Sequence, residues 1–202
     1  MSLTLRSHDF SELRLATLEM ERGHYLDFTS LMSLIISRNR EKLWAIIKAD
    51  VSKFRVAKGS SHNHQAWEGG YLDHIAETMN IACQLYRTLS SLRKLPFTLG
   101  EALEVMFLHD IEKPFAEELK AGGRYTKAAR KGFRADMIDK YEIDLTPAQE
   151  NALRYVEGVP DLEYTPGERL MGELASFCHC CDILSARLWH DKGEGVPAPA
   201  WE

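Results

Sequence analysis

An adjacent histidine and aspartate, His109 and Asp110, end an apolar run over residues 102–108. Both residue types are metal ligands, and a charged pair beside a core element is costly unless it is paired or binds a metal. Two further candidates, His74 and Asp182, lie elsewhere in the chain, the second within an apolar stretch. Two imidazoles with two carboxylates suit Mn, Fe, Co, Ni, Zn or Mg. The sequence therefore predicts a divalent metal site, provided that the fold brings these four residues together.

The segments that carry these residues have the sequence signs of helices. Capping residues and apolar periodicity predict helices over residues 9–21, over 28–47 (one helix, or two with a break near 37–39), over 71–92, over 98–110, from Thr146 onward, and over 165–190. Residues 51–68 lack helical periodicity, and residues 60–64 resemble a loop. Strand signals are scarce, so we predict an all-α bundle of about seven or eight helices.

The length and composition indicate one large domain with extensions. The chain has 202 residues, and 45% of them are hydrophobic, which is enough for a real core. We expect an N-terminal helical extension over residues 1–55 packed on the core, a domain with the metal ligands over 56–192, and a flexible tail over 193–202. Leu31, Leu34 and Ile35 are candidates to pack on this domain or on a second copy in a homo-oligomer.

Composition excludes several classes of protein. No apolar run approaches the roughly 20 residues that cross a bilayer, and the first residues do not resemble a signal peptide. The net charge of −5 excludes nucleic-acid binding over the whole surface, and no stable nucleic-acid complex is expected. Cys178, Cys180 and Cys181 crowd into one helical turn, where they cannot easily pair, so we expect a reducing cytoplasm.

Three stretches of the chain resemble the HD-domain superfamily of metal-dependent phosphohydrolases. Residues 64–74 read HQAWEGGYLDH and resemble the family stretch HHAYxGGLLEH. Residues 108–114 read LHDIEKP and resemble LHDIGKP, while residues 181–186 read CDILSA and resemble ADxLSA. The resemblance implies an HD-domain-like helical bundle. It also implies that a divalent metal ion is held by His74, His109, Asp110 and Asp182, and that a metal-activated water cleaves a phosphoester.

The chain departs from this family pattern at two places. Glu112 stands where the family usually has glycine, which alters the turn beside the metal. Many two-metal relatives also carry histidine between the His-Asp pair and the last aspartate, whereas residues 151–158 contain none. We therefore expect one metal ion per chain.

The resemblance suggests roles for further residues in hydrolysis, by a phosphomonoesterase or a phosphodiesterase. Lys113 is positioned to neutralise phosphate charge, and His64 to contact phosphate or donate a proton to the leaving oxygen. The expected substrate is a small phosphorylated compound, with a nucleotide favoured. Candidate substrate-binding residues are Trp67, which would stack on a base, and the basic residues Arg124, Lys127 and Arg130, which would attract an anion.

Other interpretations of the same residues stay open. The chain is also consistent with a catalytically silent nucleotide-binding or regulatory module of this fold, because of Glu112 and the missing histidines. Oxygen-dependent cleavage at a di-iron centre is a third alternative. The basic segment, which contains Arg124, Lys127 and Arg130, can be a solvated helix face, and Trp67 can be a core residue. The cysteine cluster around His179 is interpreted as core rather than zinc, because no second cysteine pair exists.

Overall fold

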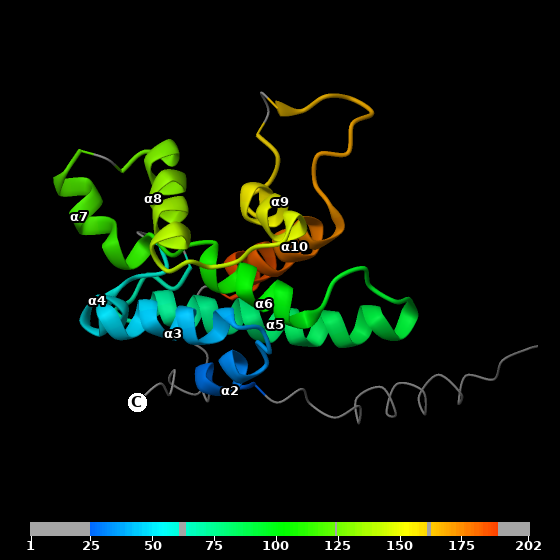
Figure 1. The fold of residues 1–202 in the computed structure, drawn as a ribbon, viewed down its shortest axis with the longest axis horizontal. Coiled ribbons are helices and arrows are strands. Elements are labelled where there is room, and N and C mark those ends of the chain that lie inside the picture. Colours follow the sequence, from blue (N-terminus) through cyan, green and yellow to red (C-terminus); the bar gives the residue numbers. More distant parts are fainter. Residues whose placement is uncertain (1–24, 61–63, 124, 161–162, 190–202) are drawn as a thin grey trace, which may run out of the picture.

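The computed structural model describes residues 25–60, 64–123, 125–160 and 163–189. These residues form α-helices and one short 3-10 helix without any β-strand, which confirms the all-α prediction (Figure 1). None of the helices within these ranges is long and apolar enough to cross a membrane. The helix expected over residues 9–21 and the tail over 193–202 lie outside the described residues.

The long helix α5 is the element on which the other helices of the site pack. Helices α6 and α10 both pack against α5, and α9 packs against α10 (Figure 1). The elements are α2 (Phe28–Ser33), α3 (Asn39–Ala49), α4 (Val51–Val56), α5 (Gly70–Leu92), α6 (Leu99–Leu108), η1 (Lys113–Phe115), α7 (Ala116–Ala121), α8 (Lys127–Lys140), α9 (Pro147–Tyr155) and α10 (Glu173–Leu188).

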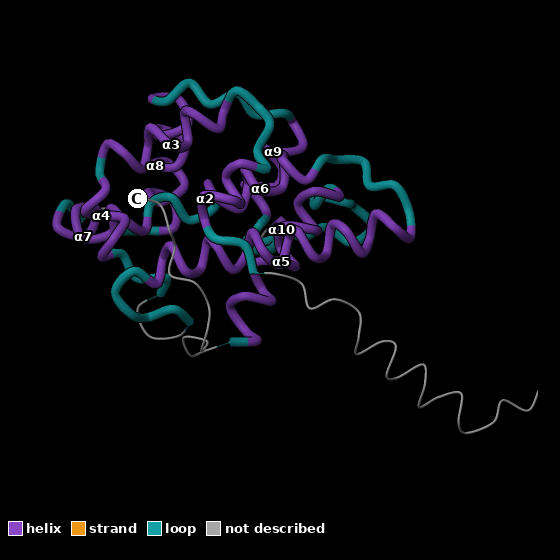
Figure 2. Tube along the Cα trace, turned by 90° about the horizontal axis from the view of Figure 1, so that it is seen from below, coloured by secondary structure: helices purple, strands orange, loops and turns teal. Residues whose placement is uncertain are grey.

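Helices α4 and α7 lie at the same end of the molecule in both views (Figures 1 and 2). Lys53 of α4 joins them through an ion pair of 2.6 Å with Glu118 of α7. The sequence analysis missed α4, since its six residues are too few for helical periodicity to show and only Phe54 among them is buried. This short helix forms part of the wall of a cavity.

The N-terminal apolar segment contains two helices, so the two-helix alternative for residues 28–47 is correct. Between α2 and α3, Asn39 donates to the carboxylate of Glu104 at 2.9 Å and to the backbone oxygen of Asp144 at 2.8 Å. Ser37 also donates to Glu104. These side chains satisfy a buried carboxylate and hold the break in place, because an unpaired buried charge is costly.

Residues 28–54 share one continuous hydrophobic core with the half of the chain that carries the candidate metal ligands. Phe28, Ile46 and Phe54 are fully buried in the same cluster as residues of α5, α6 and α10. The ring centroid of Phe28 lies 6.3 Å from that of Phe107 on α6. Much of the expected N-terminal extension therefore lies inside the main core.

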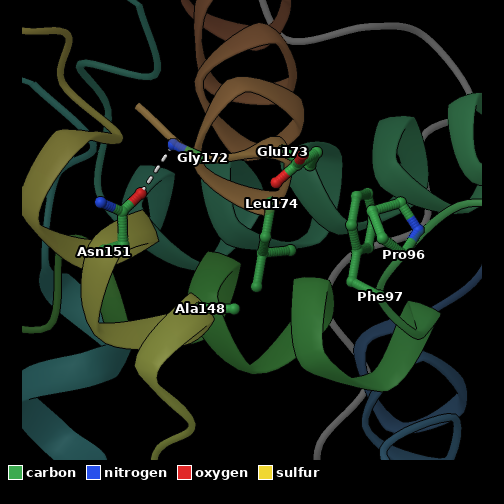
Figure 3. Close-up of a pocket in the computed structure, with 7 residues that line it drawn as sticks. All are labelled: Pro96, Phe97, Ala148, Asn151, Gly172, Glu173 and Leu174. Atoms are coloured by element: carbon green, nitrogen blue, oxygen red, sulfur yellow. Dashed lines mark hydrogen bonds between the residues drawn. The ribbon is translucent and has the colours of Figure 1, made fainter. Parts of the chain in front are cut away.

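The last helix begins later than the sequence analysis predicted. A helix was expected from Thr165, but α10 begins at Glu173, with Gly172 as its N-cap. Gly167 has a φ of +88°, which a helix does not allow. The side chain of Asn151 on α9 accepts a hydrogen bond from the Gly172 amide at 2.8 Å and marks the start of α10 (Figure 3). The Thr-Pro-Gly-Glu segment is a turn, in which the Glu168 amide donates to the Thr165 carbonyl at 3.1 Å.

Replacing Asn151 with alanine is expected to reduce the free energy of unfolding by about 1–3 kcal/mol. The side chain makes two hydrogen bonds across this joint, to the Gly172 amide and, at 2.9 Å, to the Leu170 carbonyl. Urea unfolding measures the loss. The neighbouring residue Glu150 is exposed, and the control variant Glu150→Ala should change the free energy of unfolding by less than about 0.5 kcal/mol. Equal losses in the two variants would contradict the role of Asn151.

Candidate metal centre

Three helices that pack on one another bring metal-ligating side chains to one point. His74 lies in the second turn of α5, His109 is the C-cap of α6, and Asp182 lies in the middle of α10. Each side chain offers one ligand atom, and these atoms all lie within 4.8 Å of one another. The group can therefore hold a metal ion, as the sequence analysis predicted for these three residues.

The distances within the group match those of ligands around one ion. The Nε2 atoms of His74 and His109 lie 3.2 Å apart. The Oδ1 atom of Asp182 lies 3.3 Å from Nε2 of His74 and 3.5 Å from Nε2 of His109. Ligands bound at about 2.0–2.2 Å from a metal are separated from one another by roughly 3–3.5 Å. The donor set and its spacing fit a divalent transition metal.

Asp110, the fourth predicted ligand, lies beside this group and contacts Lys113. Its Oδ2 atom is 3.3 Å from Nε2 of His109, 3.6 Å from Nε2 of His74 and 2.5 Å from Nζ of Lys113. Burial alone would raise the pKa of Asp110, but Lys113 and His109 outweigh it and hold that pKa well below its usual range. The carboxylate is therefore ionised and available at the edge of the centre.

Both imidazole rings are oriented by hydrogen bonds at Nδ1. Nδ1 of His109 donates to the Met106 carbonyl at 2.7 Å. Nδ1 of His74 lies 3.1 Å from the Ser185 hydroxyl, which itself donates to Glu77 at 2.6 Å, so the hydroxyl oxygen accepts from the ring. With the protons on Nδ1, both Nε2 atoms turn their lone pairs toward the centre. This is the tautomer that metal-binding histidines need.

The two facing Nε2 atoms need a proton or a cation between them, because two lone pairs would otherwise repel each other. Burial lowers the pKa of His74 to about 4. Burial would also lower the pKa of His109, but the carboxylates of Asp110 and Asp182 outweigh it and raise that pKa to about 10. A proton on His109 relieves the repulsion between the two rings when no metal is bound. A divalent cation would take the place of this proton, because ligating imidazoles are neutral.

Two supporting residues, Glu77 and Ser185, were not found by the sequence analysis. Glu77 follows His74 by three residues on α5, and Ser185 follows Asp182 by three residues on α10. Residues three apart share one face of a helix, so this spacing is the signal that would have found them. Together they form a chain of contacts from the Glu77 carboxylate through the Ser185 hydroxyl to the ring of His74.

Replacing Ser185 with alanine is expected to weaken metal binding by about 10–100-fold, since it breaks the contact that orients His74. Calorimetric titration of the metal-free protein with Mn²⁺ measures the affinity for the metal. Ser91→Ala, an exposed serine at the far end of α5, serves as the matched control and should bind like the parent. An unchanged affinity in Ser185→Ala would show that the hydroxyl does not support the ligand.

The predicted loop before α5 places His64 over the centre. Only glycine fits at position 70, because a Cβ atom there would lie 2.0 Å from the Gln65 carbonyl oxygen. The Gln65 side chain donates to Glu77 at 2.9 Å and ties the loop to α5. The His64 ring centroid lies 5.2 Å from that of His74, and burial together with the charge of Lys113 lowers the pKa of His64. His64 is thus a half-buried neighbour of the ligands.

The other predicted substrate-binding residues contact acidic side chains. The indole N–H of Trp67 donates to Asp73 at 2.6 Å, and Lys127 lies 3.5 Å from Glu157. Arg130 lies 3.4 Å from Glu112. Arg124 lies outside the described residues. The positive charge of the basic segment is therefore partly neutralised, and binding of substrate by these residues stays a prediction.

Glu112, which stands where the resembled family has glycine, is fully buried and contacts two arginines of α8. Arg130 Nη1 lies 3.4 Å and Arg134 Nη2 lies 3.7 Å from its carboxylate. Arg134 is itself buried and also donates to the Leu153 carbonyl at 3.0 Å. The turn after His109-Asp110 is thereby joined to α8 and α9, a consequence that the sequence analysis did not anticipate.

The cysteine cluster lies on α10, next to the candidate ligand Asp182. Cys178 and Cys181 are buried in the core, and burial raises the pKa of both thiols above the usual range. Cys180 is exposed on another side of α10. The burial of Cys178 and Cys181 agrees with their interpretation as core residues, whereas that interpretation is wrong for Cys180.

Comparisons with protein-family models, with curated proteins and with solved structures find no match for this chain. The resemblance of three stretches to the HD-domain superfamily therefore stays a prediction.

Proposed function

We propose that this protein is a metal-dependent phosphohydrolase of the HD-domain type, which cleaves a phosphoester of a nucleotide or another small phosphorylated compound. The observation that carries the proposal is the convergence of His74, His109 and Asp182 from three helices. Asp110 and Lys113 lie beside these ligands, and the order of all five residues along the chain is that of the resembled family.

The residues of the centre divide the chemical roles between them. His74, His109 and Asp182 would hold one divalent ion, with Asp110 as a further ligand. Such an ion lowers the pKa of a bound water and polarises a phosphoryl oxygen. The Lys113 ammonium is mostly buried, and in that environment it would offset phosphate charge strongly. His64 approaches from the loop before α5, where it would contact the phosphate or the leaving oxygen.

The proposal is tested by hydrolysis assays on metal-free protein to which Mn²⁺, Co²⁺, Ni²⁺, Zn²⁺ or Mg²⁺ is added. The substrates are p-nitrophenyl phosphate, bis(p-nitrophenyl) phosphate and a set of nucleotides. We expect at least one metal to stimulate turnover, and Asp110→Asn to reduce it by about 100-fold or more. Asp139→Asn, an exposed aspartate on α8, is the matched control and should retain activity.

Two results would count against the hydrolase. If His109→Ala and Asp110→Asn proteins hydrolyse phosphoesters as well as the parent, the activity does not come from this centre. If the parent binds a nucleotide tightly but shows no turnover with any metal, the catalytically silent binding module is the better description.

A further inference from the structure

A cavity of about 520 Å³ lies directly beside the metal centre. Helix α4 and residues 57–60 form one side of it, and Lys113, Pro114 and the start of α7 form the other. The Lys113 ammonium lies 2.5 Å from Asp110, so this lysine belongs to both the cavity wall and the centre. A cavity of this size accommodates a small organic molecule.

Most of the charged residues that line this cavity are lysines, in a protein whose net charge is −5. Its charged residues are four lysines and one glutamate, namely Lys53, Lys58, Lys113, Lys120 and Glu117. The charge of Lys53 is neutralised by Asp50 at 3.2 Å and Glu118 at 2.6 Å, and that of Lys120 in part by Glu117 at 2.7 Å.

Lys58 is exposed, and the structure gives it no carboxylate partner among the described residues. Lys113 forms an ion pair with Asp110 at the centre, whereas Lys58 belongs to the segment that leads from α4 to the His64 loop. The cavity thus offers one positive group shared with the centre and further positive groups away from it. Lysine binds phosphate as a point charge and needs no fixed geometry.

The rest of the lining is apolar or aromatic. Val56, Ala57, Pro114 and Ala116 contribute aliphatic surface. The ring of Tyr125 is 38% exposed, and the Lys120 ammonium lies 5.3 Å from its centroid. Positive groups with apolar surface among them suit a molecule that has anionic groups joined by a carbon skeleton.

We propose that this cavity binds the body of the substrate, and that Lys58 and Lys120 bind a second phosphate group on it. The inference rests on the proposed function, which assigns the first phosphate to the metal centre and Lys113. The substrate class is then an organic bisphosphate. It occupies the cavity beside α4, away from Trp67 and Lys127, which are held by Asp73 and Glu157.

Binding of alkyl phosphonates to the Mn²⁺-loaded protein tests this proposal by calorimetry. Propane-1,3-bisphosphonate and hexane-1,6-bisphosphonate are compared with propylphosphonate. Hydrolysis of phosphoesters does not cleave their P–C bonds, so binding is measured without turnover. We expect at least one bisphosphonate to bind about tenfold more tightly than the monophosphonate, since each charge-assisted contact contributes a comparable factor.

The double variant Lys58→Ala, Lys120→Ala should bind the bisphosphonates no more tightly than propylphosphonate. Lys94→Ala, Lys140→Ala removes the same charge at exposed positions outside the cavity lining and should keep the preference. All substituted side chains are exposed, and a thermal melt confirms that both variants are folded. Equal affinities of the parent for one and two phosphonates, or an unchanged preference in the first variant, would overturn the proposal.

The two proposals fail in different ways. A bisphosphonate preference that depends on Lys58 and Lys120, without hydrolysis of any phosphoester, would keep the binding cavity and remove the hydrolase. Metal-stimulated hydrolysis without any such preference would keep the hydrolase and remove the second phosphate site.

Discussion

Replacing Asp182 with asparagine is expected to lower the metal content from about one ion per chain to nearly none, and to abolish metal-stimulated hydrolysis. Asp182 Oδ1 lies within 3.5 Å of both imidazole Nε2 atoms. Burial would raise the pKa of Asp182, but the neighbouring imidazoles of His109 and His74 outweigh it and hold this pKa far below its usual range. The asparagine keeps the shape of the side chain and removes the negative charge that a cation needs.

Elemental analysis of both proteins, after loading with Mn²⁺, Ni²⁺ or Zn²⁺ and gel filtration, measures this effect. Asp139→Asn makes the same chemical change at an exposed position on α8 and should retain the parent's metal content. Far-ultraviolet circular dichroism verifies that each variant is helical. A metal content in Asp182→Asn equal to that of the parent would show that α10 contributes no ligand.

The Arg134→Met variant is expected to lose about 3–5 kcal/mol of its free energy of unfolding. Arg134 is buried and lies 3.7 Å from Glu112, whose side chain is 0% exposed. Removing the arginine leaves this carboxylate with Arg130 alone, at 3.4 Å. A buried charge that has lost a partner is costly, because water cannot replace the lost contact. The loss should therefore far exceed that of a surface ion pair.

Urea unfolding compares this variant with Arg154→Met, which breaks an exposed pair with Glu163 at 2.9 Å and should cost at most about 1 kcal/mol. The double variant Glu112→Gln, Arg134→Met removes both charges and should recover most of the stability. Similar losses in Arg134→Met and Arg154→Met would contradict the prediction. So would a double variant that is as unstable as Arg134→Met alone.

Local signals in the sequence were sufficient for the helix starts that depend on nearby residues. The helix starts expected at Thr98 and Thr146 are confirmed, since Thr98 with Glu101 and Thr146 with Gln149 form capping boxes. Each box joins residues three apart, so its hydrogen bonds depend only on the local backbone. The start of α10 was predicted wrongly because the bond that marks it comes from Asn151, on another helix.

The sequence by itself determined the all-α class, because helical patterning is a local property, and it indicated three of the candidate metal ligands through residue type and short motifs. Only the tertiary structure decided that His74, His109 and Asp182 meet, that Glu77 and Ser185 orient one ring, and that Glu112 joins α8. These contacts join residues far apart in the chain, and their geometry follows from how α5, α6 and α10 pack. The cavity beside Lys113 depends in the same way on the short helix α4, whose six residues carry too little pattern to predict.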